Sequence, residues 1–251
     1  MIVETDDEFE ALRAIGRICA DTLQAMRLAL EPGMTTQELD DIGRRLLDQA
    51  GAVSAPEGCY NFPGATCISV NEEAAHGIPG PRVIMAGDLV NIDVSASKDG
   101  FFADCGASQL LGKGHPMVEA LVKDGKRAMN IGLKEVMADA PLANIGRAVG
   151  AFAKSKGYTL VENLCSHGIG RSLHEEPTEI PTWPVKRDRR IIKQGLVLTV
   201  EPFLSLGATW ADTREDDWTL YGDPEAPVVQ FEHTVVAGKN GPIILTLPSA
   251  S

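Results

Sequence analysis

The chain has 251 residues, of which 44% are hydrophobic and 23% charged, and this composition excludes disordered, collagen-like and coiled-coil proteins. A formal net charge of -12 disfavours nucleic acid as the main partner, because a broad phosphate-binding face would oppose the protein's own field. The five scattered cysteines indicate reduced thiols, and the acidic start of the sequence has neither a secretory signal nor a membrane-spanning run, so a cytoplasmic location is expected.

Apolar residues at three- and four-residue steps predict four helices: 7–30, 36–50, one opening at residue 116, and 141–156. Thr5 and Glu8 stand at capping-box spacing before the first helix, and Thr35 and Glu38 repeat that spacing before the second. Gly157 is expected to end the fourth helix, because glycine tolerates the left-handed conformation that closes many helices.

Short β-rich segments bounded by Gly, Pro or Asp-Gly signals are predicted strands: 66–70, 89–94, 101–104, 196–201, 228–236 and 243–245. The order of helices, strands, helices and strands favours an α+β fold over alternating βαβ units. The proline-spaced stretch 177–190 is predicted to be a long exposed loop. Because no linker or low-complexity segment divides the chain, residues 1–251 are expected to form a single domain.

The two halves of the sequence echo one another without a strict period. Helix two and helix four each contain an Ile-Gly-Arg tripeptide, and the segment 76–78 repeats the His-Gly-Ile of segment 167–169. The offsets differ from pair to pair, so any single match could arise by chance. Together the echoes favour a duplicated unit made of helices and a hairpin.

One acidic residue falls in each of four predicted strands: Asp93, Asp104, Glu201 and Glu232. The dipeptide Asp99-Gly100 is a two-residue hairpin signal, which would pair residue 104 with residue 95 and place Asp104 diagonal to Asp93 on one sheet face. A three-residue turn with a bulge would separate the two carboxylates. A carboxylate in an apolar run is costly to bury unless a cation or partner compensates its charge.

Each acid alone is better explained as a solvent-facing strand residue, and each His beside Gly as part of a tight turn. The acids are accompanied, however, by three histidine-containing motifs: NEEAAHGIP at 71–79, HGIGRSLHEEP at 167–177 and QFEHT at 230–234. With Asp93 and Asp104, these motifs resemble the type I methionine aminopeptidases, M24-type metallopeptidases of the pita-bread fold. The resemblance runs from the first helix to Thr246, with the motifs in the expected order and at comparable spacing.

The resemblance implies a curved antiparallel sheet surrounded by duplicated helix-plus-hairpin units with pseudo-two-fold symmetry. It also implies five ligands for two divalent metal ions, Asp93, Asp104, His167, Glu201 and Glu232, with Asp104 and Glu232 bridging the ions. The chemistry agrees, because four converging carboxylates would repel one another without cations. An oxygen-rich ligand set with one imidazole suits Mn, Fe(II), Co or Zn and argues against a thiolate zinc site.

By the same resemblance, the protein is a catalytic metallopeptidase domain that removes N-terminal methionine when the second residue is small. Glu201 would be the general base for the attacking water and would pass its proton to the leaving amine. His174 would hydrogen-bond the carbonyl oxygen, and His76 would contact the scissile amide nitrogen or the incoming peptide. The remaining histidines, His115 and His233, are expected to lie outside the ligand set.

The resemblance also places six residues around the substrate side chain: Pro56, Cys59, Phe62, Cys67, Leu173 and Trp218. The family commonly has Tyr at the position of Cys59 and Phe at the position of Leu173. Losing two aromatic walls would widen the slot, and such contacts alter selectivity by roughly 10- to 200-fold. A relaxed preference for methionine is therefore expected.

Two alternatives remain open from the sequence. One keeps the fold and metals but has broadened or proline-directed specificity, and the other is a metal-free binding protein on the same fold. The expected partners are the N-terminal peptides of nascent chains, with no membrane and no main nucleic-acid ligand, and the protein is expected to be a monomer. The basic run 186–190 is expected to be a solvated loop, with a transient ribosome contact as the alternative.

Overall fold

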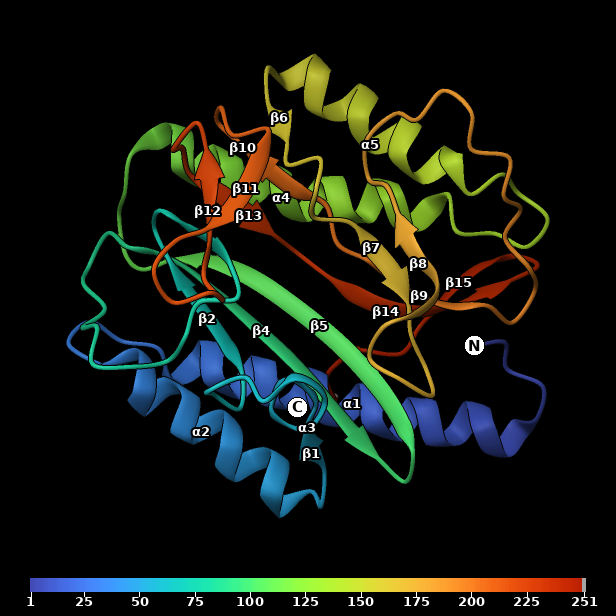
Figure 1. The fold of residues 1–251 in the computed structure, drawn as a ribbon, viewed down its shortest axis with the longest axis horizontal. Coiled ribbons are helices and arrows are strands. Elements are labelled where there is room, and N and C mark those ends of the chain that lie inside the picture. The colour runs from blue at the N-terminus through green and yellow to red at the C-terminus, as the bar shows by residue number, and fades with distance from the viewer. Residues whose placement is uncertain (250–251) are drawn as a thin grey trace.

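The computed structural model describes residues 1–249, so the last two residues of the expected domain lie outside the described part. Two pairs of helices lie on opposite sides of the strands (Figure 1). One pair is α1 (Asp6–Ala29) and α2 (Thr36–Gln49), and the other is α4 (Pro116–Lys134) and α5 (Ala143–Lys156). The four predicted helices are confirmed, and the arrangement gives each half of the chain its own helical cover.

Local signals set the helix ends. The capping box at Thr35 and Glu38 is present, with each side chain bonded to the other residue's backbone N–H. At α1 only half of the predicted box forms, because Thr5 accepts from the Glu8 N–H while the Glu8 carboxylate accepts from the N–H of Glu4. Gly157 ends α5 with φ 78°, in the left-handed region that glycine adopts without strain.

The central hairpin consists of β4 (Leu89–Lys98) and β5 (Phe101–Leu110), both longer than predicted. Asp99 and Gly100 join them with φ angles of 52° and 79°, the two positive values that a two-residue hairpin turn requires. The short strands β1 (Val53–Ser54) and β2 (Cys67–Val70) pair antiparallel with β4, one after the other along the edge opposite β5. The apolar face of α1 packs against β4 and β5 and is fully buried at Leu12 and Ile15.

The second half contains a five-stranded antiparallel sheet in the order β15 (Gly241–Ile244), β14 (His233–Gly238), β9 (Val197–Val200), β7 (Ser166–Gly168) and β8 (Glu175–Ile180). The prediction of a loop over 177–190 is therefore wrong at its start. Ile180 anchors β8 because its side chain is completely buried, a contact that the surrounding prolines and charges concealed. From residue 181 to residue 190 the chain contains isolated turns and no regular strand or helix.

The predicted strand 228–236 is in fact two strands, β13 (Val228–Gln230) and β14. Between them Phe231 forms a bridge to Ala107 of β5, and the Glu232 N–H donates to the carbonyl of Gly106. The chain thus leaves one sheet and enters the next at Glu232, and this crossing joins the second half of the protein to the central hairpin.

Several short elements were not predicted from the sequence: α3 (Ala55–Tyr60), β3 (Glu73–Ala75), β6 (Thr159–Leu160), β10 (Phe203–Ser205), β11 (Trp210–Thr213) and β12 (Leu220–Asp223), besides β1, β7 and β8. They have two to six residues each, too few for a periodic pattern. Among the described residues, no helix combines the length and the apolar character that a membrane crossing requires.

Candidate metal centre

The central hairpin brings the first two predicted ligands together. Residue 104 is opposite Ser95, as the two-residue turn predicts, and Asp93 is opposite Gly106. Asp93 and Asp104 therefore lie diagonally on the same face of the sheet, where their side chains are within reach of one another.

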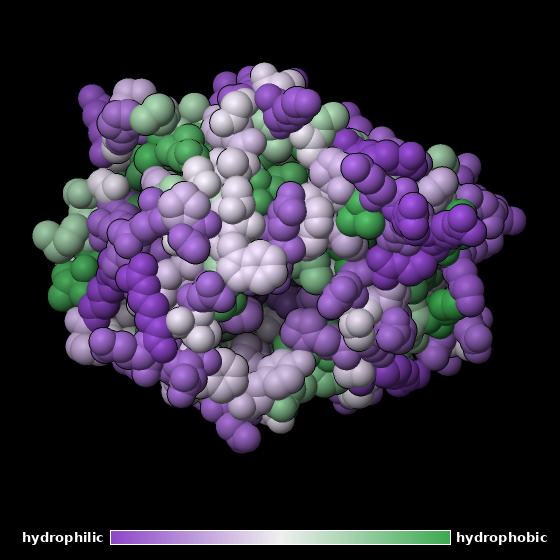
Figure 2. Space-filling model, turned by 45° about the horizontal axis from the view of Figure 1, so that its top comes forward, coloured by the Kyte–Doolittle hydropathy of each residue, from purple (hydrophilic) through white to green (hydrophobic). Residues whose placement is uncertain are grey.

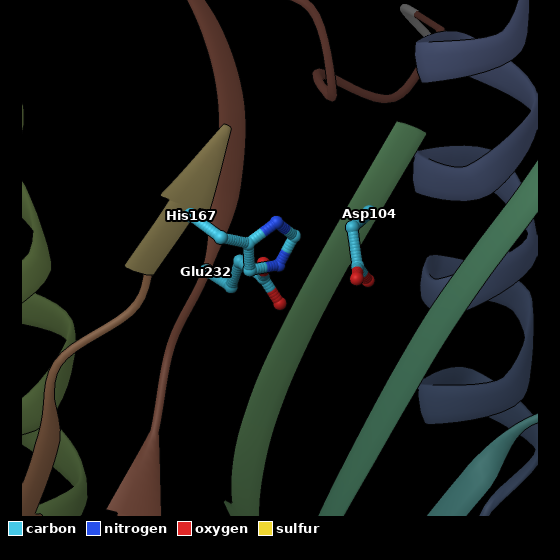
Figure 3. A group of neighbouring side chains, drawn as sticks. All are labelled: Asp104, His167 and Glu232. Carbon is cyan, nitrogen blue, oxygen red and sulfur yellow. The ribbon is translucent and has the colours of Figure 1, made fainter. Parts of the chain in front are cut away.

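The second half of the chain supplies the other three predicted ligands, one imidazole and two carboxylates. His167 lies in β7, Glu201 follows the last residue of β9, and Glu232 lies at the crossing between β13 and β14. Glu201 is thus at the end of a strand, as the sequence predicts, whereas Glu232 lies between two strands and not inside one, where the sequence analysis had placed it. Figure 3 shows Asp104, His167 and Glu232 pointing toward one another from three separate elements, and their ligand atoms all lie within 4.8 Å of one another.

His167 is held in one tautomer. Its Nδ1 lies 3.0 Å from the carbonyl oxygen of Gly168, which can only accept, so Nδ1 carries the proton and Nε2 presents a lone pair. Burial lowers the pKa of His167 to about 3, which keeps the ring neutral. Nε2 lies 3.4 Å from a carboxylate oxygen of Glu201, which brings the fifth predicted ligand to the same place. A neutral imidazole with a free Nε2 is the form that binds a metal.

The four carboxylates are crowded and poorly solvated. Asp104, Glu201 and Glu232 are 7%, 8% and 1% exposed, and Asp93 is partly exposed. Burial raises the pKa of Asp93 to about 6. Burial and then the charges of the neighbouring carboxylates raise the pKa values of Asp104 and Glu232 well above the ordinary range. Without cations, this group could not hold four negative charges at neutral pH.

Two oxygen atoms in this cluster have no hydrogen-bond partner in the described part of the chain. They are Oδ1 of Asp104 and Oε1 of Glu232, and both are buried. A buried carboxylate oxygen without a partner is costly, and an oxygen-rich set with one imidazole is a suitable site for divalent cations. The residues present therefore fit a metal centre.

Gln230 connects the cluster to the rest of the fold, and the sequence analysis did not identify it. Its Nε2 donates to Oδ2 of Asp93 at 3.2 Å and to Oε2 of Glu232 at 2.9 Å. Its Oε1 accepts from Asn91 Nδ2 at 2.9 Å, which fixes the orientation of the amide. One side chain thus aligns two carboxylates that belong to different halves of the protein. The QFEHT motif contains Gln230, but only the tertiary contacts reveal this role.

We expect Gly106→Ala to lower the metal affinity of the protein by about 10- to 100-fold, the usual effect of disturbing groups that orient ligands. A Cβ at Gly106 would lie 2.2 Å from Oε1 of Gln230, so the amide would have to move away from Asp93 and Glu232. Calorimetric titration with Mn²⁺ measures the effect. Gly207→Ala is the matched control, because its Cβ would meet only the Cβ of Ala226 at 3.5 Å. Equal affinities of the two variants would contradict the role given to Gln230.

A cavity opens in front of the cluster, and the molecular face in Figure 2 is hollowed near its middle. Asp93, Asp104, His167 and Glu201 lie at its base. Its walls contain predicted substrate-side residues and others that were not predicted: Pro56, Tyr60, Phe62, Cys67, Ala75, His76, Leu173, His174, Phe203 and Trp218. Phe62 and Trp218 meet edge to face with ring centroids 5.3 Å apart, which gives the apolar wall a fixed shape.

The placement of Cys59 in this wall is wrong. Cys59 is exposed, and Tyr60 lines the cavity in its place. Neighbouring residues of a helix point about 100° apart, so only one of the two can face the cavity. The six residues of α3 were too few to show from sequence which one it would be. The cavity therefore keeps one aromatic wall that the sequence analysis had counted as lost.

The two histidines expected outside the ligand set have other contacts. His115 caps the N-terminus of α4, where its Nδ1 accepts from the Met117 N–H. His233 is adjacent to Glu232, but its Nδ1 lies 2.9 Å from Oγ1 of Thr246. His76 has φ 53°, a strained value for a side chain larger than glycine, and such strain is common at functional sites.

A largely buried cluster of four carboxylates and one imidazole, most of it lining an accessible cavity in an α+β fold, is typical of a metal-dependent hydrolase. The model of metallopeptidase family M24 matches residues 10–239, and the chain belongs to this family. A methionine aminopeptidase 2 of Bacillus subtilis is 47% identical over 98% of this chain and 99% of its own length. A methionine aminopeptidase of Staphylococcus epidermidis is 46% identical over 98% of both chains.

The fold is similar to that of solved relatives over nearly its whole length. The crystal structure of methionine aminopeptidase from Rickettsia prowazekii superposes with a TM-score of 0.93 at 32% identity, covering 98% of this chain and 100% of that one. The expected α+β pita-bread fold is therefore confirmed. Membership of the family likewise confirms the expectation of a divalent-metal-dependent enzyme.

Proposed function

We propose that this protein removes the N-terminal methionine of peptides and nascent proteins by metal-assisted hydrolysis. The observation that carries the proposal is the buried carboxylate and imidazole cluster at the base of a cavity with an apolar wall. The identity of 46% and 47% to methionine aminopeptidases of equal length supports the same activity for this chain.

We propose that five residues hold two divalent cations: Asp93, Asp104, His167, Glu201 and Glu232. The unpartnered oxygens of Asp104 and Glu232 support the assignment of these two residues as the shared ligands. When bound, the cations polarise the scissile carbonyl and lower the pKa of the attacking water. The oxygen-rich donor set suits Mn, Fe(II), Co or Zn.

Glu201 is proposed as the general base. Thr199 Oγ1 donates to its Oε1 at 2.7 Å, and the Ser166 hydroxyl accepts from its backbone N–H at 2.9 Å, so the carboxylate is fixed at the cavity base. It can take a proton from water and deliver it to the departing amine. His174 and His76 line the same cavity, and they are proposed to donate to the substrate carbonyl and to contact the scissile amide, respectively.

Tyr60 is proposed to position His174. The Tyr60 hydroxyl lies 2.7 Å from Nδ1 of His174, and burial raises the pKa of the phenol, which keeps it protonated. A phenol that donates to Nδ1 leaves the proton of a neutral imidazole on Nε2, where it can be donated to a substrate oxygen. The hydroxyl of Tyr60 thus has a chemical role, while its ring forms part of the cavity wall.

Tyr60→Phe is expected to lower kcat about tenfold with little change in KM, because the ring remains while the tautomer of His174 is no longer fixed. Steady-state kinetics on a methionyl tripeptide measure kcat and KM separately, and nitrogen NMR of the His174 ring reports the tautomer directly. Cys59→Ala on the same helix should behave as the parent, since Cys59 is exposed. An unchanged tautomer in Tyr60→Phe would exclude the positioning role.

A panel of tripeptides that differ only at the first residue tests the substrate. We expect Met-Ala-Ser to be cleaved at least tenfold better than Leu-Ala-Ser or Ala-Ala-Ser in the presence of Mn²⁺, Fe²⁺, Co²⁺ or Zn²⁺. The wall formed by Tyr60, Phe62 and Trp218 supports a narrower preference than the sequence analysis expected, although Leu173 stands where the family commonly has phenylalanine.

The same panel separates the alternatives. Equal turnover of all first residues would establish broadened specificity. With Met-Pro-Ser added to the panel, cleavage of that peptide and not of Met-Ala-Ser would establish the proline-directed form. No bound metal and no cleavage after metal addition would leave the metal-free binding protein. The unpartnered oxygens of Asp104 and Glu232 favour the metal-dependent enzyme over that last alternative.

The cellular setting is also proposed. We expect one catalytic domain over residues 1–251, acting as a monomer on nascent chains in the cytoplasm. The exposed Lys186, Arg187 and Arg189 are the proposed contact for a ribosomal surface, whereas Arg190 is held by Asp188 at 2.6 Å. Sedimentation with purified ribosomes, compared between the parent and a variant in which Lys186, Arg187 and Arg189 are replaced by Gln, would test the contact.

A further inference from the structure

A second, larger cavity lies between α1 and α4 and shares no lining residue with the cavity of the metal centre. Its volume is about 700 Å³, and β5 and Phe231 form its floor. A neighbouring cavity of about 520 Å³ shares Arg27, Gln109, Lys126 and Phe231 with it and extends to Glu232 and His233. We refer to the two together as the α1–α4 groove.

The charge of the α1–α4 groove is opposite to that of the protein. Its larger part is lined by four cationic residues, Arg27, Lys123, Lys126 and Arg127, and by one acid, Glu119, although the chain carries a net charge of -12. The three cations that α4 contributes are exposed, and Lys123 lies one helical turn from both Lys126 and Arg127, so the three are close together on the helix surface. Glu119 is directed to the backbone N–H of Gly114 at one end of the groove.

Arg27 is the unusual member of this group. Its guanidinium is partly buried, and burial lowers its pKa from the ordinary value. Its Nε donates to Oε1 of Gln109 at 3.2 Å, and Gln109 Nε2 donates back to the Arg27 carbonyl at 3.3 Å. Within residues 1–249, no carboxylate oxygen lies within 4.0 Å of Arg27 or of the three cations of α4. A fixed, partly desolvated guanidinium without a counter-ion is a donor available to an anion.

We propose that the α1–α4 groove binds a small anion with two or more phosphate groups. The planar fork of Arg27 would hold one phosphate, and the flexible ammonium groups of Lys123 and Lys126 would neutralise the next. Within the larger part of the groove the only aromatic lining side chain, Phe231, is 6% exposed, so a nucleobase would find no ring on which to stack. A long nucleic acid would also extend beyond the groove into the negative field of the protein. The site therefore selects a short polyphosphate and not an RNA strand.

Calorimetric titration of tripolyphosphate into the metal-loaded protein tests the site. Excess Mg²⁺ saturates the probe beforehand, so that it does not remove metal from the centre. We expect one binding event, weakened about tenfold or more in Arg27→Gln and in Lys126→Gln, as for loss of a charge-assisted hydrogen bond. Arg17→Gln is the matched control, since it removes the same charge from an exposed position of the same helix.

The outcomes separate the groove from other sites. Retained methionyl-peptide turnover in the variants shows that the fold and the metal centre are intact, and Lys126 is exposed, so its replacement tests the groove even if Arg27→Gln unfolds. Equal binding by Lys126→Gln and Arg17→Gln, or no binding by the parent, would overturn the proposal. Tighter binding of a ten-nucleotide RNA than of tripolyphosphate would overturn the assignment to a small anion.

Discussion

Glu201→Gln is expected to lower kcat by about 10²- to 10⁴-fold, the range associated with loss of a general base. The amide has the same size as the carboxylate and can still accept from Thr199, whose hydroxyl lies 2.7 Å from Oε1, so the chain should remain folded. The amide cannot take a proton from water. Turnover of Met-Ala-Ser at saturating metal measures the loss.

Two controls make this result specific to the base. Glu225→Gln removes a carboxylate that is 64% exposed and paired only with Arg214, and it should leave turnover unchanged. Metal content measured on the same samples separates the base from the ligand role of Glu201. If Glu201→Gln carries the parent's metal content and turns over substrate within threefold of the parent, Glu201 is not the base.

Removing the metal is expected to abolish turnover and to lower the melting temperature. Burial, and then the charges of the neighbouring carboxylates, raise the pKa values of Asp104 and Glu232, so ionising both groups in the metal-free protein is costly, and cations relieve this cost. Metal at one hundred times its dissociation constant should stabilise the fold by about 2.7 kcal/mol. For a chain of this size, that corresponds to roughly 5 to 10 °C in differential scanning calorimetry.

Asp104→Asn is expected to raise the stability of the metal-free protein and to abolish its activity. Folding of the metal-free parent must either bury the charge of Asp104 or protonate the group, and a neutral amide requires neither. The metal-free variant should therefore melt a few degrees above the metal-free parent, at roughly 2 to 4 °C per kcal/mol. It should gain little from added metal and show no turnover. A metal-free Asp104→Asn protein that melts below the metal-free parent would contradict the electrostatic account of the site.

These two results would separate a catalytic from a structural view of the buried carboxylates. Replacing a group that is retained for stability destabilises the protein. Replacing a group that is retained for metal chemistry stabilises the protein in the absence of metal. Gln230 serves both stability and metal binding. Its amide hydrogen-bonds one oxygen each of Asp93 and Glu232, and it leaves the buried oxygens Oδ1 of Asp104 and Oε1 of Glu232 free for cations.

The sequence by itself determined the long elements and the position of the first two acids of the candidate centre. Four helices were predictable because apolar residues recur over 14 to 24 positions in each, and their caps are local. The turn Asp99-Gly100 predicted that Asp93 and Asp104 lie on one face of the hairpin. Both turn residues adopt positive φ, and the two-residue period of the strands then fixes which side chains share a face.

Only the tertiary structure decided what short or distant segments do. The helix α3 is too short for a periodic signal, so the exchange of Cys59 for Tyr60 in the cavity wall could not be predicted. The role of Gln230 depends on contacts with Asp93, 137 residues away, and the α1–α4 groove depends on residues of two helices that come together only when the chain folds. Local patterns report backbone preference and burial, whereas the pairing of charges and hydrogen bonds is set by which segments meet when the chain folds.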